Sequence, residues 1–322
     1  MTGSKDERKH FDGRRFHNPD RDVRGLGDFV KWMRTRQRGQ WRDFENTPPG
    51  PPPPRRVTDL RVTFVSHATL LVQTGDLNVL TDPVWSDRVS PVSWAGPRRR
   101  RPPGIRFADL PQIDLVLLSH NHYDHLDLPT LARLESRDRP SIFCGLGVGD
   151  LLRKNGMRDV TELDWWDSAP ARRGLSVMST PVQHFSGRGL FDRNQTLWTG
   201  FMLSGGAGHV FFAGDTGYGP HFAEIRRRLG KTRLALLPIG AYKPVWFMGP
   251  VHMSPEQALA AHRDLEADTS VGIHYGTFEL ADDGQDEPRQ EIERGLAQSP
   301  LSESRFWVLE NGEGRDVPAS RD

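Results

Sequence analysis

Residues 114–127 read DLVLLSHNHYDHLD, and this stretch decides the fold of the chain. Its first half is an apolar run that predicts a buried strand, and its second half is a loop rich in metal-binding side chains. The candidate ligands in the loop are His120, His122, Asp124 and His125. Imidazole nitrogens and carboxylate oxygens bind zinc at ~2.0–2.2 Å, and catalytic zinc sites leave one position open for water. His120 and His122 point the same way in an extended loop, whereas Asp124 and His125 can turn toward a second ion.

Three more candidate ligands stand where other predicted strands end. His184, Asp215 and His274 each follow an apolar run, at 175–178, 210–213 and 271–273 respectively. One loop cannot complete two metal sites, so further ligands must come from other parts of the fold. Their repeated placement at strand ends favours a ligand role over a structural hydrogen-bonding role. The sequence therefore predicts a metal centre assembled from the loops that follow several strands.

From residue 57 onward, short apolar runs alternate with turn residues and a few helical stretches. The expected strands are 61–65, 70–73, 78–80, 115–118, 142–144, 175–178, 201–203, 210–213, 234–238 and 271–274. One helix is expected after Ser254, with Pro255 in its first turn and Gln257 completing a capping box. A second helix is expected at 221–229, ended by Gly230. Many strands with helices between them predict one compact mixed α/β domain with helices outside the sheets.

These features make the segment from about 60 to 280 resemble the metallo-β-lactamase superfamily, whose pattern is His-x-His-x-Asp-His followed by distant His, Asp and His residues. Within that superfamily, the chain most resembles the N-acyl-phosphatidylethanolamine-hydrolysing phospholipase D group and its bacterial relatives. Four further segments carry this closer resemblance. They are SHAT at 66–69, LTDPVWS at 80–86, LLPIGAY at 236–242 with WFM at 246–248, and IHYGTF at 273–278.

The resemblance implies a fold and a ligand set. The fold is a four-layer αββα sandwich of the metallo-β-lactamase type, with two zinc ions at one edge between the sheets. One ion is expected on His120, His122 and His184, the other on Asp124, His125 and His274, with Asp215 bridging the two. Histidine and carboxylate ligands also accept iron, manganese or cobalt, so zinc is the default expectation among several metals.

Three other residues receive roles around this centre. His252 corresponds to a substrate-site histidine near the start of a helix, although the following Met253 and Ser254 depart from the family's usual residues. His67 and Asp82 are expected to orient the metal ligands or to shape the pocket, since metal sites need such partners to hold their geometry.

The resemblance also implies a reaction. Two ions about 3.5–4 Å apart can share a water, lower its pKa toward ~7 and stabilise both oxygens of a displacement. The hypothesis is a phosphodiesterase of phospholipase D type, acting on N-acyl phosphatidylethanolamine or a related phospholipid by attack of metal-bound hydroxide, with Asp124 accepting the water proton. A lactonase or β-lactamase would use the same ions on a carbonyl carbon, and a metal-dependent nuclease is a third alternative. A non-catalytic binding protein is disfavoured because every ligand position is filled.

Residues 1–56 form a basic arm, in contrast to the net acidic segment 57–322. The proline-rich run PPGPPPP at 48–54 predicts a stiff extended linker, so a hydrolase domain is expected at 57–322. Leu26, Phe29, Val30 and Met33 have helical spacing, which predicts a short basic amphipathic helix. Such a helix can pack on its own domain, on a partner subunit of a homodimer, or on a membrane surface.

A second basic feature follows Gly96 and Pro97. It consists of Arg98, Arg99, Arg100 and Arg101, which suit a phosphate group or an anionic membrane, or form a solvated loop. Nucleic acid is a disfavoured partner because no recognition motif accompanies these arginines. No apolar run approaches the ~20 residues that span a bilayer, and the charged N-terminus does not resemble a secretion signal. A cytoplasmic location is expected, with peripheral contact at the inner membrane surface as an extension of it.

Overall fold

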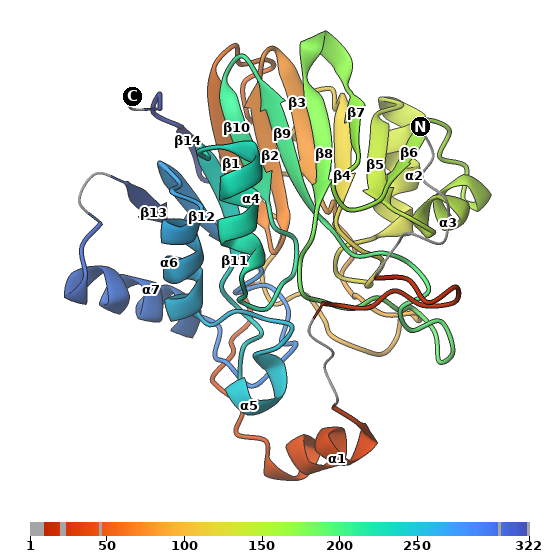
Figure 1. Ribbon diagram of the computed structural model, residues 1–322, viewed down its shortest axis with the longest axis vertical. Coiled ribbons are helices and arrows are strands. Elements are labelled where there is room, and N and C mark those ends of the chain that lie inside the picture. The colour runs from red at the N-terminus through yellow and green to blue at the C-terminus, as the bar shows by residue number, and fades with distance from the viewer. Residues whose placement is uncertain (1–9, 20–23, 45–46, 302–303, 321–322) are drawn as a thin grey trace.

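The structure, a computed structural model, describes residues 10–19, 24–44, 47–301 and 304–320. Two seven-stranded sheets lie face to face, with strand orders β14-β1-β2-β3-β4-β5-β6 and β13-β12-β11-β10-β9-β8-β7 (Figure 1). The first sheet contains β1 (Leu60–Ser66), β2 (Thr69–Thr74), β3 (Leu77–Thr81), β4 (Leu115–Leu118), β5 (Ser141–Gly145), β6 (Val160–Leu163) and β14 (Gly314–Asp316). The second contains β7 (Ser168–Pro170), β8 (Ser176–Thr180), β9 (Gly200–Gly205), β10 (Gly208–Phe212), β11 (Leu234–Pro238), β12 (Thr269–Ile273) and β13 (Arg305–Trp307).

Helices cover the outer faces of both sheets. The helices are α1 (Leu26–Thr35), α2 (Leu128–Arg137), α3 (Val148–Lys154), α4 (His221–Leu229), α5 (Val245–Met248), α6 (Pro255–Asp264) and α7 (Glu287–Gln298). Side chains of α2 and α3 join the apolar cluster on the outer face of the first sheet. Those of α4, α6 and α7 join the cluster that contains the second sheet and the space between the sheets. The four layers form the predicted αββα sandwich (Figure 1).

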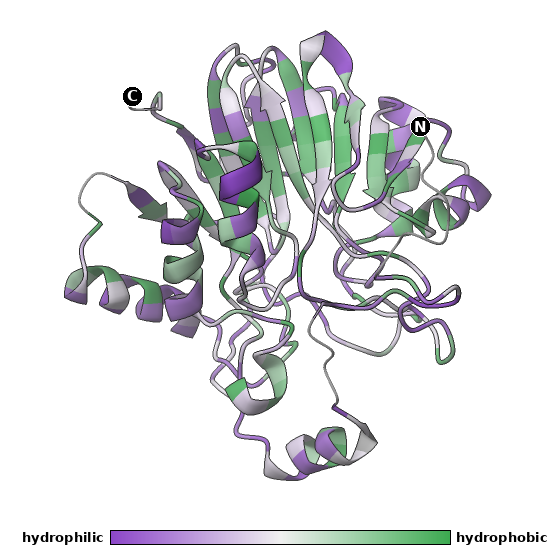
Figure 2. Cartoon of the chain, in the orientation of Figure 1, coloured by the Kyte–Doolittle hydropathy of each residue, from purple (hydrophilic) through white to green (hydrophobic). Residues whose placement is uncertain are grey.

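The strands pack between these layers because their residues alternate between two apolar faces. In β1, Val62 and Phe64 turn toward the second sheet, whereas Val65 turns toward the cluster under α2 and α3. Strands buried on both faces are apolar over most of their length, and in Figure 2 the strands carry mostly green and white bands, whereas the outer helices carry purple turns. The predicted strand regions and the two predicted helices of this segment are confirmed, with bounds that differ by a few residues.

Parallel pairing brings the chemistry to one edge of the sandwich. Strands β3 to β6 are parallel to one another in the first sheet, and β10 to β13 are parallel in the second. The carboxyl ends of parallel strands lie at the same edge, so the loops that follow them meet there. The loops after β3, β4, β10 and β12 hold Asp82, the 119–127 run, Asp215 and His274.

The described parts of the N-terminal arm pack on the sandwich. The helix α1 contacts α5 below the edge where the loops meet (Figure 1). Trp32 is buried, and its indole nitrogen donates to Asp282 Oδ2 at 2.9 Å, while Arg36 Nε donates to Asp282 Oδ1 at 2.6 Å. Phe29, Val30 and Met33, on the rest of the predicted stripe, are partly exposed, and the side chain of Leu26 lies outside the described part. None of the described helices has the length and apolar run that crossing a bilayer requires.

Candidate metal centre

The seven predicted ligands lie together at the edge where the strand ends meet. Together with His67, Asp82 and His252, their side chains fall into overlapping groups, and within each group the ligand atoms lie within 4.8 Å of one another. The groups are His120, His122 and His184; His67, Asp124, His125 and His274; Asp82, His120 and His125; and His184, Asp215 and His252. Residues that are far apart in the chain thus converge on one place, as the strand topology requires.

The first group consists of three imidazoles. His120 Nε2 lies 2.7 Å from His122 Nδ1, and His184 Nε2 lies 3.3 Å from the same atom. His184 Nδ1 lies 3.0 Å from the carbonyl oxygen of Val251, which can only accept, so Nδ1 carries the proton. The Nε2 atom of His184 therefore turns an unprotonated lone pair toward the other two rings.

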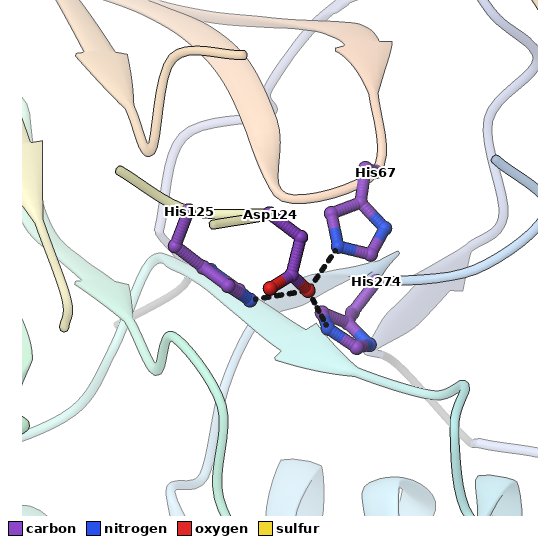
Figure 3. Close-up of side chains that lie close together, drawn as sticks. All are labelled: His67, Asp124, His125 and His274. Carbon is purple, nitrogen blue, oxygen red and sulfur yellow. Dashed lines mark hydrogen bonds and ion pairs between the residues drawn. The ribbon is translucent and has the colours of Figure 1, made fainter. Parts of the chain in front are cut away.

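The second group surrounds one carboxylate oxygen (Figure 3). Asp124 Oδ2 lies 3.0 Å from His67 Nε2, 3.2 Å from His125 Nε2 and 3.3 Å from His274 Nε2. His67 thus contacts a predicted ligand directly, in agreement with a role in orienting it. It also lies close enough to the other three side chains to hold a metal with them.

Asp215 lies between the two groups. Its Oδ2 atom is 3.0 Å from His274 Nε2 and 3.2 Å from His125 Nε2 in the second group, and 3.8 Å from His184 Nε2 in the first. The glycine before it permits this position. Gly214 has a φ of 60°, and a Cβ there would lie 2.4 Å from Ser119 Cβ, next to His120. Only glycine lets the end of β10 approach the end of β4 so closely.

Asp82 holds one ligand ring from behind. Its fully buried carboxylate accepts hydrogen bonds from Ser119 N at 2.8 Å and Ser119 Oγ at 2.5 Å, and Oδ2 lies 2.6 Å from His125 Nδ1. Because the carboxylate accepts, His125 Nδ1 carries the proton and Nε2 faces the centre. The Oγ atom of Ser119 also lies 2.9 Å from His120 Nδ1. One buried carboxylate and one hydroxyl therefore set the orientation of two rings.

The backbone is strained at three of these positions. His67, Asp82 and His274 have φ values of 53°, 32° and 61°, in the left-handed region that side chains with a Cβ rarely adopt. Such strain costs about 1–3 kcal/mol per residue and persists where the surrounding structure fixes it, often at functional sites. Here the hydrogen bond from His274 N to the carbonyl oxygen of His67, 2.9 Å long, joins two of the strained residues.

Burial makes four of the imidazoles weak bases. It lowers the pKa of the ring to about 4 in two of them and well below the ordinary value in the other two. These rings are therefore neutral at pH 7, which is the form that binds a metal. They are His122 and His252, with a pKa of about 4, and His120 and His184, with the lower values.

The other side of the centre contains two carboxylates, those of Asp124 and Asp215. Burial alone would lower the pKa of His274, but the charge of Asp215 and hydrogen bonding to Asp124 raise it to about 9. Burial would likewise raise the pKa of both carboxyls, yet the neighbouring imidazoles, His125 first, hold it well below the usual value. Two buried carboxylates that stabilise an imidazolium will stabilise a metal cation in the same way.

His252 lies at the border between the centre and a cavity. Its ring centroid is 5.1 Å from that of His184, and its Nδ1 is 3.9 Å from Asp215 Oδ2. The cavity has a volume of about 660 Å³ and is mostly apolar. Its lining consists of Arg24, Gly25, Phe29, Trp32, Phe185, Arg193, Phe247, Met248, Val251, His252 and Leu280. Part of one wall is α1, so the arm contributes to the pocket.

The arginine run is engaged within the protein. Arg99 is buried and donates to Ser66 Oγ at 2.9 Å and to the carbonyl oxygen of Val84 at 2.9 Å. Arg100 pairs with Glu279 at 3.1 Å, and its neighbours pair with other carboxylates, Arg98 with Asp87 and Arg101 with Glu310, at 3.4 Å each. These contacts tie the 85–101 loop to the sandwich. The predicted contact of the run with phosphate or membrane receives no support from this arrangement.

The donor set fits a divalent transition metal. Neutral imidazoles on one side and carboxylates with imidazoles on the other are the ligands that zinc and its neighbours accept. Two buried side-chain atoms of the predicted ligands, His125 Nε2 and Asp215 Oδ1, have no hydrogen-bond partner among the described residues. Leaving buried polar atoms without a partner is costly, and a bound cation would satisfy both.

Comparison with known proteins agrees with this geometry. The sequence profile of the β-lactamase superfamily domain matches residues 77–275, which include all seven predicted ligands. The chain belongs to the metallo-β-lactamase superfamily. This superfamily's hydrolase fold implies divalent metal binding, and the histidine and aspartate groups described above are where this member can provide it.

Relatives of this metallo-β-lactamase superfamily member include an uncharacterized protein of Mycobacterium tuberculosis, 44% identical over 243 residues that cover 74% of this chain and 63% of that protein. The chain thus spans less than two thirds of that relative. It is 38% identical to N-acyl-phosphatidylethanolamine-hydrolyzing phospholipase D 1 of Caenorhabditis elegans, over 79% of this chain and 75% of that protein. The mitochondrial N-acyl-phosphatidylethanolamine-hydrolyzing phospholipase D of Saccharomyces cerevisiae is also 38% identical, over 67% of this chain and 47% of that protein.

Solved structures show the same fold. A metallo hydrolase from the archaeon Ignicoccus hospitalis matches 80% of this chain and 97% of its own with a TM-score of 0.59 and 24% identity. An isothiocyanate hydrolase from Delia radicum gut bacteria matches 80% of this chain and 98% of its own, with a TM-score of 0.63 and 20% identity.

Some residues of the site carry no signal in the sequence. Ser119 stands next to His120 in the motif, but a serine at this position does not indicate that its side chain will bond Asp82 and an imidazole. Asn18 lies in the arm, yet its side chain bonds the backbone of His184. The wall formed by Phe29, Trp32 and Phe247 depends on where α1 docks, which the helical spacing alone does not specify.

Proposed function

We propose that the protein is a phosphodiesterase of phospholipase D type, with N-acyl phosphatidylethanolamine or a related phospholipid as its substrate. The observation that carries this proposal is the cavity beside the metal centre. Its lining is apolar apart from His252 and two guanidinium groups, those of Arg24 and Arg193. A ligand that fits this chemistry has an anionic group for the arginines and an apolar chain for the aromatic wall. The names of the worm and yeast relatives support the same substrate class.

The centre is proposed to hold two zinc ions. His120, His122 and His184 would hold one, Asp124, His125 and His274 the other, and Asp215 would contact both from its position between the two groups. When bound, such ions lower the pKa of a shared water and stabilise negative charge on phosphoryl oxygens.

The protein's own residues position the substrate and move the proton. The lowered pKa of Asp124 keeps its carboxylate ionised, so Oδ2 can accept a proton from a water beside it. His252 is neutral, and its buried Nδ1 has no hydrogen-bond partner among the described residues, so it can bond a substrate oxygen at the cavity border. Arg193, stacked on Phe185 with its guanidinium carbon 4.5 Å from the ring centroid, would bind a non-bridging phosphate oxygen.

Contact with a membrane surface is part of the proposal. Phe29, Val30 and Met33 on α1 and Val245 and Trp246 on α5 are between 39% and 52% exposed, and we call these five side chains the α1–α5 apolar face. Exposed cations on α1, Lys31 and Arg34, border this face. An apolar face with a basic border suits an anionic lipid surface, from which a phospholipid could enter the adjoining cavity.

A hydrolysis screen tests the substrate. The zinc-loaded protein is assayed on N-acyl phosphatidylethanolamine, bis(p-nitrophenyl) phosphate, a lactone and a β-lactam. We expect turnover of the phospholipid to exceed that of the lactone and the β-lactam. A protein that opens only the lactone or the β-lactam would be a carbonyl hydrolase, and one that cleaves nucleic acid in preference to lipid would be a nuclease.

Three variants test the site. Asp124→Asn and His184→Ala should each remove nearly all turnover, since each deletes a ligand, while His252→Ala should reduce it by about tenfold to a hundredfold. His209→Ala is the matched control, because His209 is a half-buried histidine on β10 that contacts Ser204 instead of the metal centre. The measurements are kcat and KM together with thermal unfolding. A double variant of Asp124 and His184 with the wild-type rate would contradict the site assignment.

A further inference from the structure

The segment 10–19 of the N-terminal arm reaches the metal centre from outside the sandwich. The side-chain amide of Asn18 donates to the carbonyl oxygen of His184 at 2.8 Å, and its Oδ1 accepts from His184 N at 3.2 Å. The same Oδ1 atom accepts from Trp198 Nε1 at 2.9 Å. An amide side chain thus satisfies both backbone polar groups of a predicted metal ligand, as a neighbouring strand would do.

This contact occurs where the backbone has no strand of its own. His184 follows β8 by several residues and lies in the loop that leads to the exposed segment 187–194. Its ring is fixed at one end by the bond from Nδ1 to the Val251 carbonyl oxygen. The ladder hydrogen bonds of β8 end at Thr180, and the preceding Gln183 is held by Thr216 and Gly217. At His184 itself, the Asn18 amide bonds both the N–H and the carbonyl oxygen, so Asn18 helps to fix the depth at which Nε2 enters the centre.

The arm is held firmly enough to perform this task. Phe16, two residues earlier, is 4% exposed and packs against Val182, Leu197 and Trp198. Its backbone N–H donates to the carbonyl oxygen of Asn194 at 2.8 Å. His10 stacks on Trp165 with ring centroids 4.5 Å apart and pairs with Asp164 at 2.7 Å. Apolar burial and ring stacking of the residues that precede Asn18 thus restrict its movement.

We propose that Asn18 is a positioning residue for the metal ligand His184, so that the N-terminal arm completes the metal centre of the hydrolase domain. The proposal rests on the metal site of the proposed function but not on its substrate. Removing a partner that orients a metal ligand typically lowers metal affinity by 10–100-fold. A residue that only stabilised the fold would lower the melting temperature and leave the metal affinity unchanged.

The test measures zinc affinity by competition with a fluorescent chelator, in the full-length protein and without substrate. Asn18→Ala removes all three hydrogen bonds, and we expect about tenfold weaker binding of the less tightly held zinc. Asn18→Asp keeps the shape and the accepting oxygen but replaces the donor with an oxygen that faces the His184 carbonyl, so a similar loss is expected. The matched control is Asn155→Ala, which removes an exposed asparagine that donates to the Leu151 carbonyl oxygen in α3, away from the centre.

The activity of the variants provides a second readout. For Asn18→Ala, kcat should fall at limiting zinc and recover when zinc is in excess, while KM changes by less than about twofold, because the cavity wall is intact. If Asn18→Ala does not fold, the same zinc titration of the isosteric Asn18→Asp variant tests the proposal.

The outcomes separate this inference from the substrate assignment. A folded Asn18→Ala or Asn18→Asp protein with the zinc affinity of wild type overturns the positioning role. A wild-type protein that binds zinc but hydrolyses no phospholipid overturns the proposed substrate, and the affinities still decide on Asn18. A wild-type protein that takes up no transition metal overturns both.

Discussion

At the scale of single residues, the centre depends on carboxylates that orient imidazoles as much as on the ligands themselves. Asp82 makes the clearest case. It is fully buried, it is 2.6 Å from His125 Nδ1, and Ser119 supplies two further hydrogen bonds to it. If the carboxylate loses its charge, the proton on His125 is no longer held at Nδ1, and the lone pair at Nε2 is no longer directed at the centre.

We therefore expect Asp82→Asn to weaken zinc binding by about 10–100-fold and to lower kcat in proportion, with a smaller effect on KM. Chelator competition and steady-state kinetics are the measurements. Asp138→Asn is a suitable control, because Asp138 is a carboxylate that accepts a backbone hydrogen bond from Ile113 at 3.0 Å at the far end of α2. Equal zinc affinity in the Asp82 variant and wild type would show that Asp82 serves the fold alone.

The sequence made the candidate ligands visible because their types and their places at strand ends are local properties. The contacts of each ligand depend on the tertiary structure, so they could not be predicted from the sequence. Nothing in the sequence distinguishes Arg99, which is buried against Ser66 and Val84, from Arg98 beside it, which remains partly exposed. Burial of a charged side chain depends on partners distant in the chain, so the run was read as a surface feature.

At the scale of elements, helix α6 is joined to the second sheet through a buried histidine. His262 lies 1% exposed between β12 and the segment before β13, with Nδ1 2.7 Å from Ser270 Oγ and Nε2 2.9 Å from Ser304 Oγ. Burial, aided by the charge of Arg263, lowers the pKa of His262 to about 4, because the imidazolium would lose its hydration there. The folded protein therefore carries this ring in the neutral form.

This shift predicts a loss of stability in mild acid. A histidine in the unfolded chain has a pKa near 6.5, so between about pH 6.5 and pH 4 the unfolded chain binds more protons than the folded one. The stability is fully present above about pH 6.5 and is lost as the pH drops toward 4, and the loss reaches roughly 2 kcal/mol at pH 5.

Urea unfolding at pH 7 and pH 5 measures this loss. His262→Gln, which cannot titrate, should lose about 2 kcal/mol less stability than wild type between the two pH values. Other titrating groups and any bound metal affect both proteins alike and cancel in the comparison. Parallel losses in the two proteins would mean that His262 is not the group responsible.

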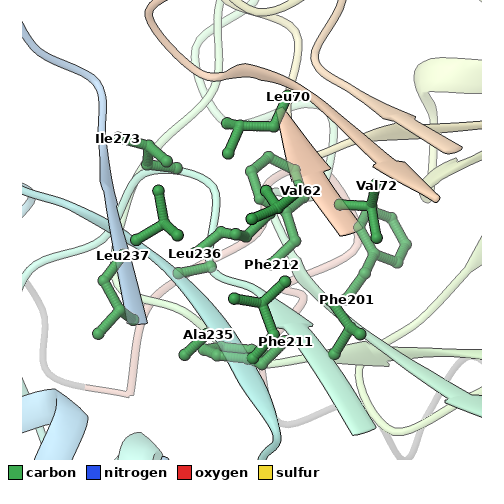
Figure 4. Close-up of a cluster of buried hydrophobic side chains, with 14 of the residues drawn as sticks. Val62, Leu70, Val72, Phe201, Phe211, Phe212, Ala235, Leu236, Leu237 and Ile273 are labelled. Carbon is green, nitrogen blue, oxygen red and sulfur yellow. The ribbon is translucent and has the colours of Figure 1, made fainter. Parts of the chain in front are cut away.

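The elements also show where prediction from the sequence succeeds. Interior strands were predicted because both of their faces are apolar, and Figure 4 shows Val62, Leu70 and Val72 of one sheet meeting Phe201 and Phe212 of the other. The helices α2, α3 and α7 and the short edge strands β6, β7, β13 and β14 were not predicted. Surface helices of this kind bury a narrow stripe and edge strands are short, so most of their stability comes from packing that the local sequence does not reveal.

At the scale of the whole molecule, the arm and the sandwich act as one structure. The arm was expected to be separated from the hydrolase domain by a stiff linker, and the proline-rich segment 48–54 forms neither helix nor strand. Yet Asn18 reaches the metal centre, Trp32 and Arg36 bond Asp282, and α1 walls the cavity. A proline-rich linker can carry the chain across the surface of the sandwich. From composition alone, such a linker is interpreted as a boundary between the arm and the hydrolase domain.

This arrangement places the α1–α5 apolar face next to the cavity, since Phe29 belongs to both, and it predicts binding to anionic vesicles. Lys31 Nζ lies 4.6 Å from the centroid of the Trp246 ring, so a cation sits directly on the apolar face. Electrostatic attraction brings the face to the lipid, and it weakens as salt shortens the Debye length. In sedimentation with phosphatidylglycerol vesicles, the bound fraction of protein should therefore decrease when the salt concentration is raised from about 50 mM to about 500 mM.

Substitutions of side chains that do not line the cavity test whether this face, and not another exposed apolar group, binds the lipid. Met33→Ser combined with Val245→Ser removes two half-exposed side chains, each contributing roughly 0.7 kcal/mol when buried in lipid, so binding should fall about tenfold. The comparison is Leu190→Ser with Phe191→Ser, which removes the exposed pair of the 187–194 segment, 91% and 84% exposed. Loss of binding only in the second pair would place the lipid contact on that loop, and no binding by wild type at low salt would exclude a lipid surface as the partner. Loss only in the first pair would place the lipid contact on α1 and α5, next to the cavity that α1 helps to line.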